Sequence, residues 1–190
     1  MKKLPRSFYL RPTITVAQDL LGKYIIRKLG RQRLIGKIVE TEAYGERDPA
    51  SHSYRGKTKR NEVMFWEGGH LYVYFTYGMH FCANVVTGPE GRGEAVLIRA
   101  VEPIDGIEAM VKKRTTPLLT TLTDGPAKFC QAFGIGRKEN GIDLLGDEIY
   151  ITNGERIPRS RIGKSIRIGI TNGKEKKWRF FVSGNTYVSR

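Results

Sequence analysis

Two glutamates, Glu40 and Glu42, stand two residues apart near the end of a largely apolar stretch over residues 34–44. A period of two predicts a strand here, with both carboxylates and Tyr44 on one face. Strands disfavour glutamate, and like charges on one face repel, so we expect a structural or functional reason for the two glutamates. They are either a solvated strand face paired with Lys or Arg, or they include a carboxylate that activates a water molecule as a general base.

A lone arginine, Arg99, lies inside the apolar run 95–101. A charge in such a strand must be paired or face a cleft, because burying it without a partner is costly. It is either a structural salt bridge or a functional partner of Glu40 or Glu42.

His52 lies in the polar loop 45–61, which follows the glutamate strand. A histidine in a loop can be ordinary polar surface. Because the loop is short, His52 could also return to the same pocket, where its ring nitrogens can donate to or accept from the edge of a heterocycle.

Three tyrosines lie within the segment 71–79, which bends at Gly78. They can form an aromatic core strand. Tyr77, however, falls at the bend, where an exposed ring could push between stacked bases. Tyr74 lies further down the same strand and could act as a stacking wall, since base–aromatic stacking contributes about 1–3 kcal/mol per base.

The chain has 190 residues, with 33 Lys and Arg against 19 Asp and Glu, which gives a formal net charge of +14. The two ends are basic, at +10 over residues 1–60 and +9 over residues 111–190, whereas residues 61–110 carry −5. Such a chain is either merely soluble or has a positive face that binds the phosphates of a nucleic acid. Nucleic acid is therefore the first partner to consider.

Several other classes of protein are not expected. No apolar run approaches the ~20 residues that cross a bilayer, and the N-terminus lacks the apolar stretch of a signal peptide. Two cysteines, Cys82 and Cys130, cannot form a disulfide framework and indicate packed thiols in a cytoplasmic protein. The three histidines have no metal-ligand spacing, so no metal is expected. Glycine-rich nucleotide motifs are incomplete, so no cofactor is expected.

Antiparallel strands and a few short helices must position these residues. Gly78 predicts a hairpin, Thr15 and Asp105 predict capping boxes, and Pro126 suits a helix start. This pattern predicts a single mixed α+β domain over residues 1–190. The expected strands are 23–29, 34–44, 70–77, 79–87, 94–102 and 178–182, and the expected helices are 15–21, 105–114 and 124–134.

An ordered set of strings resembles the alkyladenine (3-methyladenine) DNA glycosylase family. The resemblance runs from about Leu10 to the Phe181-Val182 region, so it covers nearly the whole chain. Each string alone is moderately specific, and their shared order is strongly so. The strings are Ile38-Val39-Glu40-Thr41-Glu42-Ala43-Tyr44, His52-Ser53, Arg60-Asn61, Met64-Phe65, Leu71-Tyr72-Val73-Tyr74, Tyr77-Gly78-Met79, Phe81-Cys82, Asn84, Arg99-Ala100, Glu102-Pro103 and Gly125-Pro126-Ala127-Lys128.

The resemblance implies roles for individual residues. Glu42 matches the family's catalytic glutamate, which holds and deprotonates the attacking water, and Arg99 matches the arginine that helps to position that water. Three further residues match the pocket that clamps the flipped base: Tyr44, His52 and Tyr74.

The resemblance also extends to the hairpin and the fold. Tyr77 matches the tyrosine that fills the gap left in the duplex, and Asn84 matches the asparagine that disfavours normal guanine. One departure is His80, where tyrosine is more usual, so the contacts beside Tyr77 are expected to differ from those of the family. The implied fold has a curved antiparallel sheet, short flanking helices and a protruding β-hairpin. The family uses no metal.

Taken together, these features predict a DNA repair glycosylase that flips alkylated or deaminated purines out of duplex DNA and leaves an abasic site. No lysine stands among the motif residues as a nucleophile, so no strand cleavage is expected. We expect a monomer that binds double-stranded DNA and no membrane, in the cytoplasm and associated with the nucleoid if the source is bacterial. The sequence does not choose among 3-methyladenine, 7-methylguanine, hypoxanthine and etheno adducts.

Two alternatives remain open on the residues. A non-catalytic basic module of the translation machinery would need the positive flanks but not a converging Glu42, Arg99 and Asn84. The C-terminal domain of methionyl-tRNA formyltransferase has the same general shape, so the fold alone does not decide. A hydrolase of small glycosides would explain the carboxylate but not the charge or the hairpin tyrosine.

Overall fold

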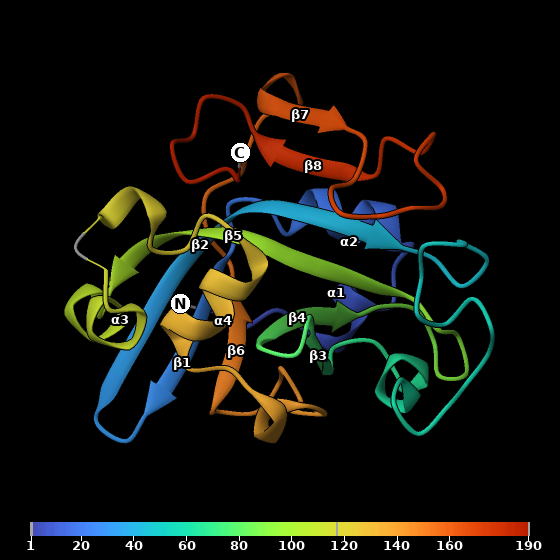
Figure 1. Ribbon diagram of the computed structural model, residues 1–190, viewed down its shortest axis with the longest axis horizontal. Helices are drawn as coiled ribbons and strands as arrows, with labels where there is room; N and C mark the ends of the chain where they lie inside the picture. The colour runs from blue at the N-terminus through green and yellow to red at the C-terminus, as the bar shows by residue number, and fades with distance from the viewer. Residues whose placement is uncertain (1, 117, 190) are drawn as a thin grey trace.

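One antiparallel sheet organises the protein (Figure 1). The computed structural model describes residues 2–116 and 118–189. Within these residues eight strands are joined in the order β3-β4-β5-β2-β1-β6, while β8 pairs with β2 and β7. The strands are β1 (Tyr24–Leu29), β2 (Gln32–Tyr44), β3 (Leu71–Thr76), β4 (His80–Val86), β5 (Ala95–Asp105), β6 (Ile149–Thr152), β7 (Ile162–Ser165) and β8 (Arg179–Val182).

The long strand β2 is the centre of this sheet. Strand β5 pairs along one edge of β2, and β1 and β8 share the other edge. The register between β2 and β5 shifts on both sides of Glu40. A β-bulge bends a strand and increases its twist, so this irregularity helps to curl the sheet where the two glutamates lie.

In the part of the chain that the structure describes, four short α-helices pack around the sheet. Helix α2 packs against β2, and α4 packs against β4 and β5. The helices are α1 (Arg6–Tyr9), α2 (Thr13–Asp19), α3 (Ile107–Arg114) and α4 (Pro126–Phe133), and short 3-10 turns span η1 (Glu62–Phe65), η2 (Leu119–Thr121), η3 (Arg137–Glu139) and η4 (Arg159–Arg161).

The expected α+β class with a curled antiparallel sheet is confirmed. The two capping boxes are wrong. Helix α2 begins two residues early, after Pro12, and α3 begins after Gly106, whose φ of 74° lies in the left-handed region. Neither helix has a side-chain cap. The start of α4 at Pro126 is confirmed. No helix among the described residues has the length and apolar character needed to cross a membrane.

The β3–β4 hairpin ends in a strained turn. Tyr77 and Gly78 have φ values of 50° and 67°, the two left-handed positions of a type I′ turn, which the Met79 N–H closes by donating to the Thr76 carbonyl at 3.3 Å. Tyr77 is 81% exposed. A tyrosine rarely adopts positive φ, so the turn holds its ring outside the core at some cost in strain.

Candidate active site

A cavity of about 330 Å³ lies where β2, the β3–β4 hairpin and β5 meet the loop 45–61 and the segment 169–171. Six of the seven predicted site residues line it. These are Tyr44, His52, Tyr74, Tyr77, Asn84 and Arg99. The cavity therefore brings together side chains that come from four strands, a turn and a loop.

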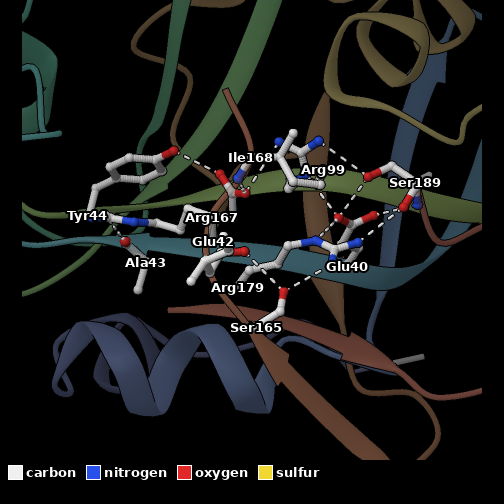
Figure 2. A network of polar contacts seen from close by, with 11 residues as sticks. Glu40, Glu42, Ala43, Tyr44, Arg99, Ser165, Arg167, Ile168, Arg179 and Ser189 are labelled. Atoms are coloured by element: carbon white, nitrogen blue, oxygen red, sulfur yellow. Dashed lines mark hydrogen bonds and ion pairs between the residues drawn. The ribbon is translucent and has the colours of Figure 1, made fainter. Parts of the chain in front are cut away.

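Glu42, the seventh predicted residue, lies directly behind this wall rather than on it. Its side chain is completely buried. The Tyr44 hydroxyl donates to Oε2 at 2.7 Å and the Ile168 N–H donates to Oε1 at 2.8 Å, as Figure 2 shows. The Arg99 guanidinium lies 3.3 Å from Oε1, the longest of the three contacts. The carboxylate thus lies behind Tyr44 and Arg99, both of which line the cavity.

Glu40 has a different environment, although it too contacts Arg99. Its carboxylate accepts from Arg99 Nε at 2.9 Å and from Arg179 Nε at 2.6 Å. The Ser189 N–H and hydroxyl donate to it at 2.6 and 2.8 Å (Figure 2). Two guanidinium groups and Ser189 therefore use the hydrogen-bonding capacity of the Glu40 carboxylate. Glu40 in turn holds the Arg99 side chain in place. The sequence did not predict Ser189, because its contacts span 149 residues.

An aromatic cluster forms another part of the cavity wall. The His52 ring stands edge-on to Tyr74, with centroids 4.4 Å apart, and its Nδ1 lies 3.1 Å from the hydroxyl of Tyr72. Burial and the positive charge of Arg60 lower the pKa of His52. The imidazole is thus held neutral near pH 7.

Three buried tyrosines of the cavity, Tyr44, Tyr72 and Tyr74, stay protonated. Burial raises the pKa of Tyr44 and Tyr74 far above the usual range, and for Tyr44 the adjacent Glu42 carboxylate adds to the shift. Burial also raises the pKa of Tyr72 to about 12. The hydroxyl of Tyr44 is therefore a hydrogen-bond donor to Glu42 at any ordinary pH.

Tyr72 is a site residue that sequence reasoning missed. It is buried and lines the cavity, and its carbonyl accepts from Asn84 Nδ2 at 3.2 Å. This bond holds the predicted Asn84 amide in place at the cavity wall. The missed signal was the spacing of Tyr72 and Tyr74, which puts both on one face of β3.

A buried ion pair supports the site from behind. Both Nη atoms of Arg167 contact the carboxylate of Asp48, and both side chains are completely buried. Burial alone would raise the pKa of Asp48, but the hydrogen bonds and charge of Arg167 outweigh it, and the pKa lies below its usual range. Sequence reasoning missed this pair, although Arg167 shows the signal that singled out Arg99, one arginine between apolar residues.

The two cysteines and the possible metal ligands were also compared with the expectations from the sequence. Cys82 and Cys130 are buried and free, as expected of packed thiols, and burial raises the pKa of both. Among residues 2–116 and 118–189, no three His, Cys, Asp or Glu side chains lie close enough together to hold a metal ion.

Known proteins resemble the chain along its whole length. A protein named "Putative 3-methyladenine DNA glycosylase" from Carboxydothermus hydrogenoformans is 55% identical over 188 residues, 98% of each chain. Proteins with the same name are 47% identical over 192 residues in Chlorobium phaeobacteroides (100% of this chain, 98% of that one) and 49% identical over 181 residues in Francisella tularensis (94% of each). The family model of methylpurine-DNA glycosylase (MPG) matches residues 7–186. The chain therefore belongs to the methylpurine-DNA glycosylase family.

Proposed function

We propose that this DNA glycosylase extrudes damaged purines from duplex DNA and hydrolyses their N-glycosidic bond with a water molecule activated by Glu42. The observation that carries the proposal is a buried carboxylate behind a cavity walled by aromatic rings, beside an exposed hairpin tyrosine. An enzyme cannot reach a sugar carbon inside a stacked duplex, so the nucleotide must leave the stack.

In this proposal the hairpin and the cavity share the cost of extrusion. Tyr77, held outward by its turn, enters the duplex and takes the place of the extruded nucleotide. The base lies between Tyr44 on one side and Tyr74 with His52 on the other. Stacking contributes about 1–3 kcal/mol per base, which offsets the few kcal/mol that unstacking costs. Asn84, held by Tyr72, crowds the edge on which normal guanine carries its amino group.

The hydrolytic step uses one carboxylate. Glu42 accepts a proton from water as the water attacks the sugar carbon, and its charge stabilises the developing cation of the sugar. Arg99, fixed by Glu40 and Ser189, holds the water from the cavity side. Glycosidases add a second carboxylic acid to protonate the leaving group. Here Glu40 is already occupied by two arginines, and an alkylated cationic purine leaves without that help.

The product should be an intact strand with an abasic site. Strand cleavage by glycosylases needs an amine that attacks the sugar carbon. No lysine lines the cavity among the residues that the structure describes.

Chromatography of free bases tests the proposal. Duplexes that each carry 3-methyladenine, 7-methylguanine, hypoxanthine or 1,N6-ethenoadenine are incubated with the protein and with Glu42→Gln. We expect native protein to release at least one of these bases and Glu42→Gln to release none. Strands should break only after alkali. Absence of any released base would overturn the proposed function, and nicking without alkali would overturn the single-step mechanism.

A further inference from the structure

The Tyr44 ring has two faces, and each meets a different environment. Arg167 Cζ lies 4.7 Å from the centroid of this ring, over its face. Arg167 is completely buried and does not line the cavity, whereas Tyr44 does. The guanidinium therefore covers the face of the ring that is turned away from the cavity, and the other face is free to stack on a base.

The guanidinium is held firmly against this face. Arg167 Nη1 donates to the Ala43 carbonyl at 2.9 Å (Figure 2), and Nη2 donates to Asp48 at 3.0 Å and to the Gly173 carbonyl at 3.2 Å. Its Cζ also lies 5.4 Å from the ring centroid of Trp178. A fixed positive charge thus stands directly behind one wall of the base pocket.

A positive charge in this place has opposite consequences for two kinds of base. Purines alkylated at N3 or N7 are cations in DNA, whereas hypoxanthine and 1,N6-ethenoadenine are neutral. A tyrosine face attracts cations, but an uncompensated guanidinium behind the ring would repel a cationic base in front of it. The carboxylate of Asp48, paired with Arg167 through both of its oxygens, cancels that repulsion.

We propose that the buried Arg167–Asp48 pair sets the preference of the cavity for cationic over neutral bases. In this pair, Asp48 neutralises Arg167, so that a cationic base can stack on Tyr44 without being repelled. The proposal rests on the proposed function, because it assigns a selectivity to the same base pocket. Neither residue touches the base; both act through the ring of Tyr44.

The signs of the effects follow from the charges around the ring. Asp48→Asn leaves Arg167 without its partner and adds one positive charge behind Tyr44. Arg167→Gln removes one positive charge, while Lys176, whose Nζ lies 3.4 Å from Asp48, keeps that carboxylate paired. The double variant restores the native net charge of the cluster.

The test is a ratio measured within one preparation. The second-order rate constant of base release is measured under single-turnover conditions for duplexes with 7-methylguanine and with hypoxanthine or 1,N6-ethenoadenine. The rate constant for the cationic base is then divided by the rate constant for the neutral base. Because the same protein acts on both, the fraction of folded protein cancels. We expect the ratio to fall about tenfold in Asp48→Asn, to rise in Arg167→Gln, and to return towards the native value in the double variant.

Glu139→Gln is the matched control. Glu139 forms another buried ion pair, with Arg27 at 2.6 Å, and neither residue lines the cavity. Its loss should cost stability but leave the ratio unchanged. For a lesion that is released too slowly to follow, Glu42→Gln is added to each variant, and the ratio of duplex dissociation constants is measured by fluorescence anisotropy.

The outcomes separate this inference from the function on which it rests. If native protein releases no base from any duplex, the proposed function fails and the inference fails with it. If native protein releases both kinds of base but Asp48→Asn and Arg167→Gln slow both equally, the pair is only structural and the inference alone is overturned. A ratio that moves in the same direction in both single variants would also overturn it.

Discussion

Glu40 and Glu42 share one guanidinium but differ in the other groups that they contact. Glu40 meets two arginines and a serine, whereas Glu42 is held by a tyrosine hydroxyl, one backbone N–H and a longer contact to Arg99. The first arrangement is that of a structural carboxylate. The second leaves a carboxylate next to the cavity with fewer charged partners, so it can still accept a hydrogen bond from a water molecule.

The two amide variants should therefore fail in different ways. Glu42→Gln should keep the fold and bind lesion duplex but release no base. Glu40→Gln should lower the free energy of unfolding by about 3–5 kcal/mol, because it leaves buried arginines without their counter-charge. Urea unfolding and base release, measured on both variants, check this. Substantial release by Glu42→Gln would move the role of the base to Glu40.

His52 provides a prediction about pH. Its pKa in the folded protein lies below the unfolded value of about 6.5, because burial and Arg60 both disfavour the charged ring. The unfolded chain then binds a proton first as the pH falls. The stability that His52 contributes is present above pH ~6.5 and is lost as the pH falls through the folded pKa.

A titration of the His52 ring by NMR measures this pKa directly. Arg60→Gln should raise it towards 6.5, since the variant removes the positive charge. Arg55→Gln is the matched control, because Arg55 is an exposed arginine of the same loop that does not contribute to the shift. A pKa that is the same in Arg60→Gln and native protein would contradict the assigned cause.

At this scale the sequence predicted the residues that touch the cavity better than those that support them. Period two put Glu42 and Tyr44 on one face of β2, and the resemblance named Tyr44 and Arg99, which line the cavity with Glu42 behind them. The partners of the supporting pair, Asp48 and Arg167, are separated by 119 residues. A pairing over that sequence separation is determined by the fold, and no local sequence pattern predicts it.

Among the elements, the β3–β4 hairpin combines a simple ladder with a costly turn. The pairing of β3 with β4 is regular from the pair Leu71–Val85 to the pair Thr76–His80, so the register determines the position of the turn. A tyrosine at a left-handed position is then unfavourable locally. Such strain is expected where an exposed side chain serves a function rather than the fold.

Tyr77→Asn should separate stability from activity. Asparagine tolerates positive φ, so the melting temperature should be unchanged or raised by up to about 2–4 °C. Release of base from duplex should fall at least tenfold, since the wedge is gone, while release from single strands should fall less. Melting curves and the ratio of duplex to single-strand release check this. An unchanged duplex rate would remove Tyr77 from the role of wedge.

The elements show what local signals can predict. Glycine and proline at turns placed the strands to within a few residues and gave the start of α4 correctly. The capping boxes at Thr15 and Asp105 misled because the backbone at Pro12 and Gly106 determined where each helix begins. The bulge at Glu40 has no sequence signal that we used, since it depends on how β2 meets β5.

For the whole molecule, charge is distributed unevenly along the chain and in space. The loop 45–61 contributes Pro49, Ala50 and His52 to the cavity and carries exposed lysines at 57 and 59. Helix α3 carries exposed lysines at 112 and 113 and lies at the opposite end of the molecule's longest axis (Figure 1). If DNA lies across the cavity, only the first pair of lysines is near its phosphates.

Salt dependence of binding distinguishes these two pairs. Each phosphate contact contributes roughly 0.9 to the slope of log K against log salt concentration, because binding releases counterions. In a Glu42→Gln background, replacing Lys57 and Lys59 by glutamine should make the slope shallower by up to about 2. Replacing Lys112 and Lys113 removes the same charge and should leave the slope unchanged, because those side chains lie far from the bound duplex. Equal changes for both pairs would mean that net charge, rather than a binding face around the cavity, attracts the DNA.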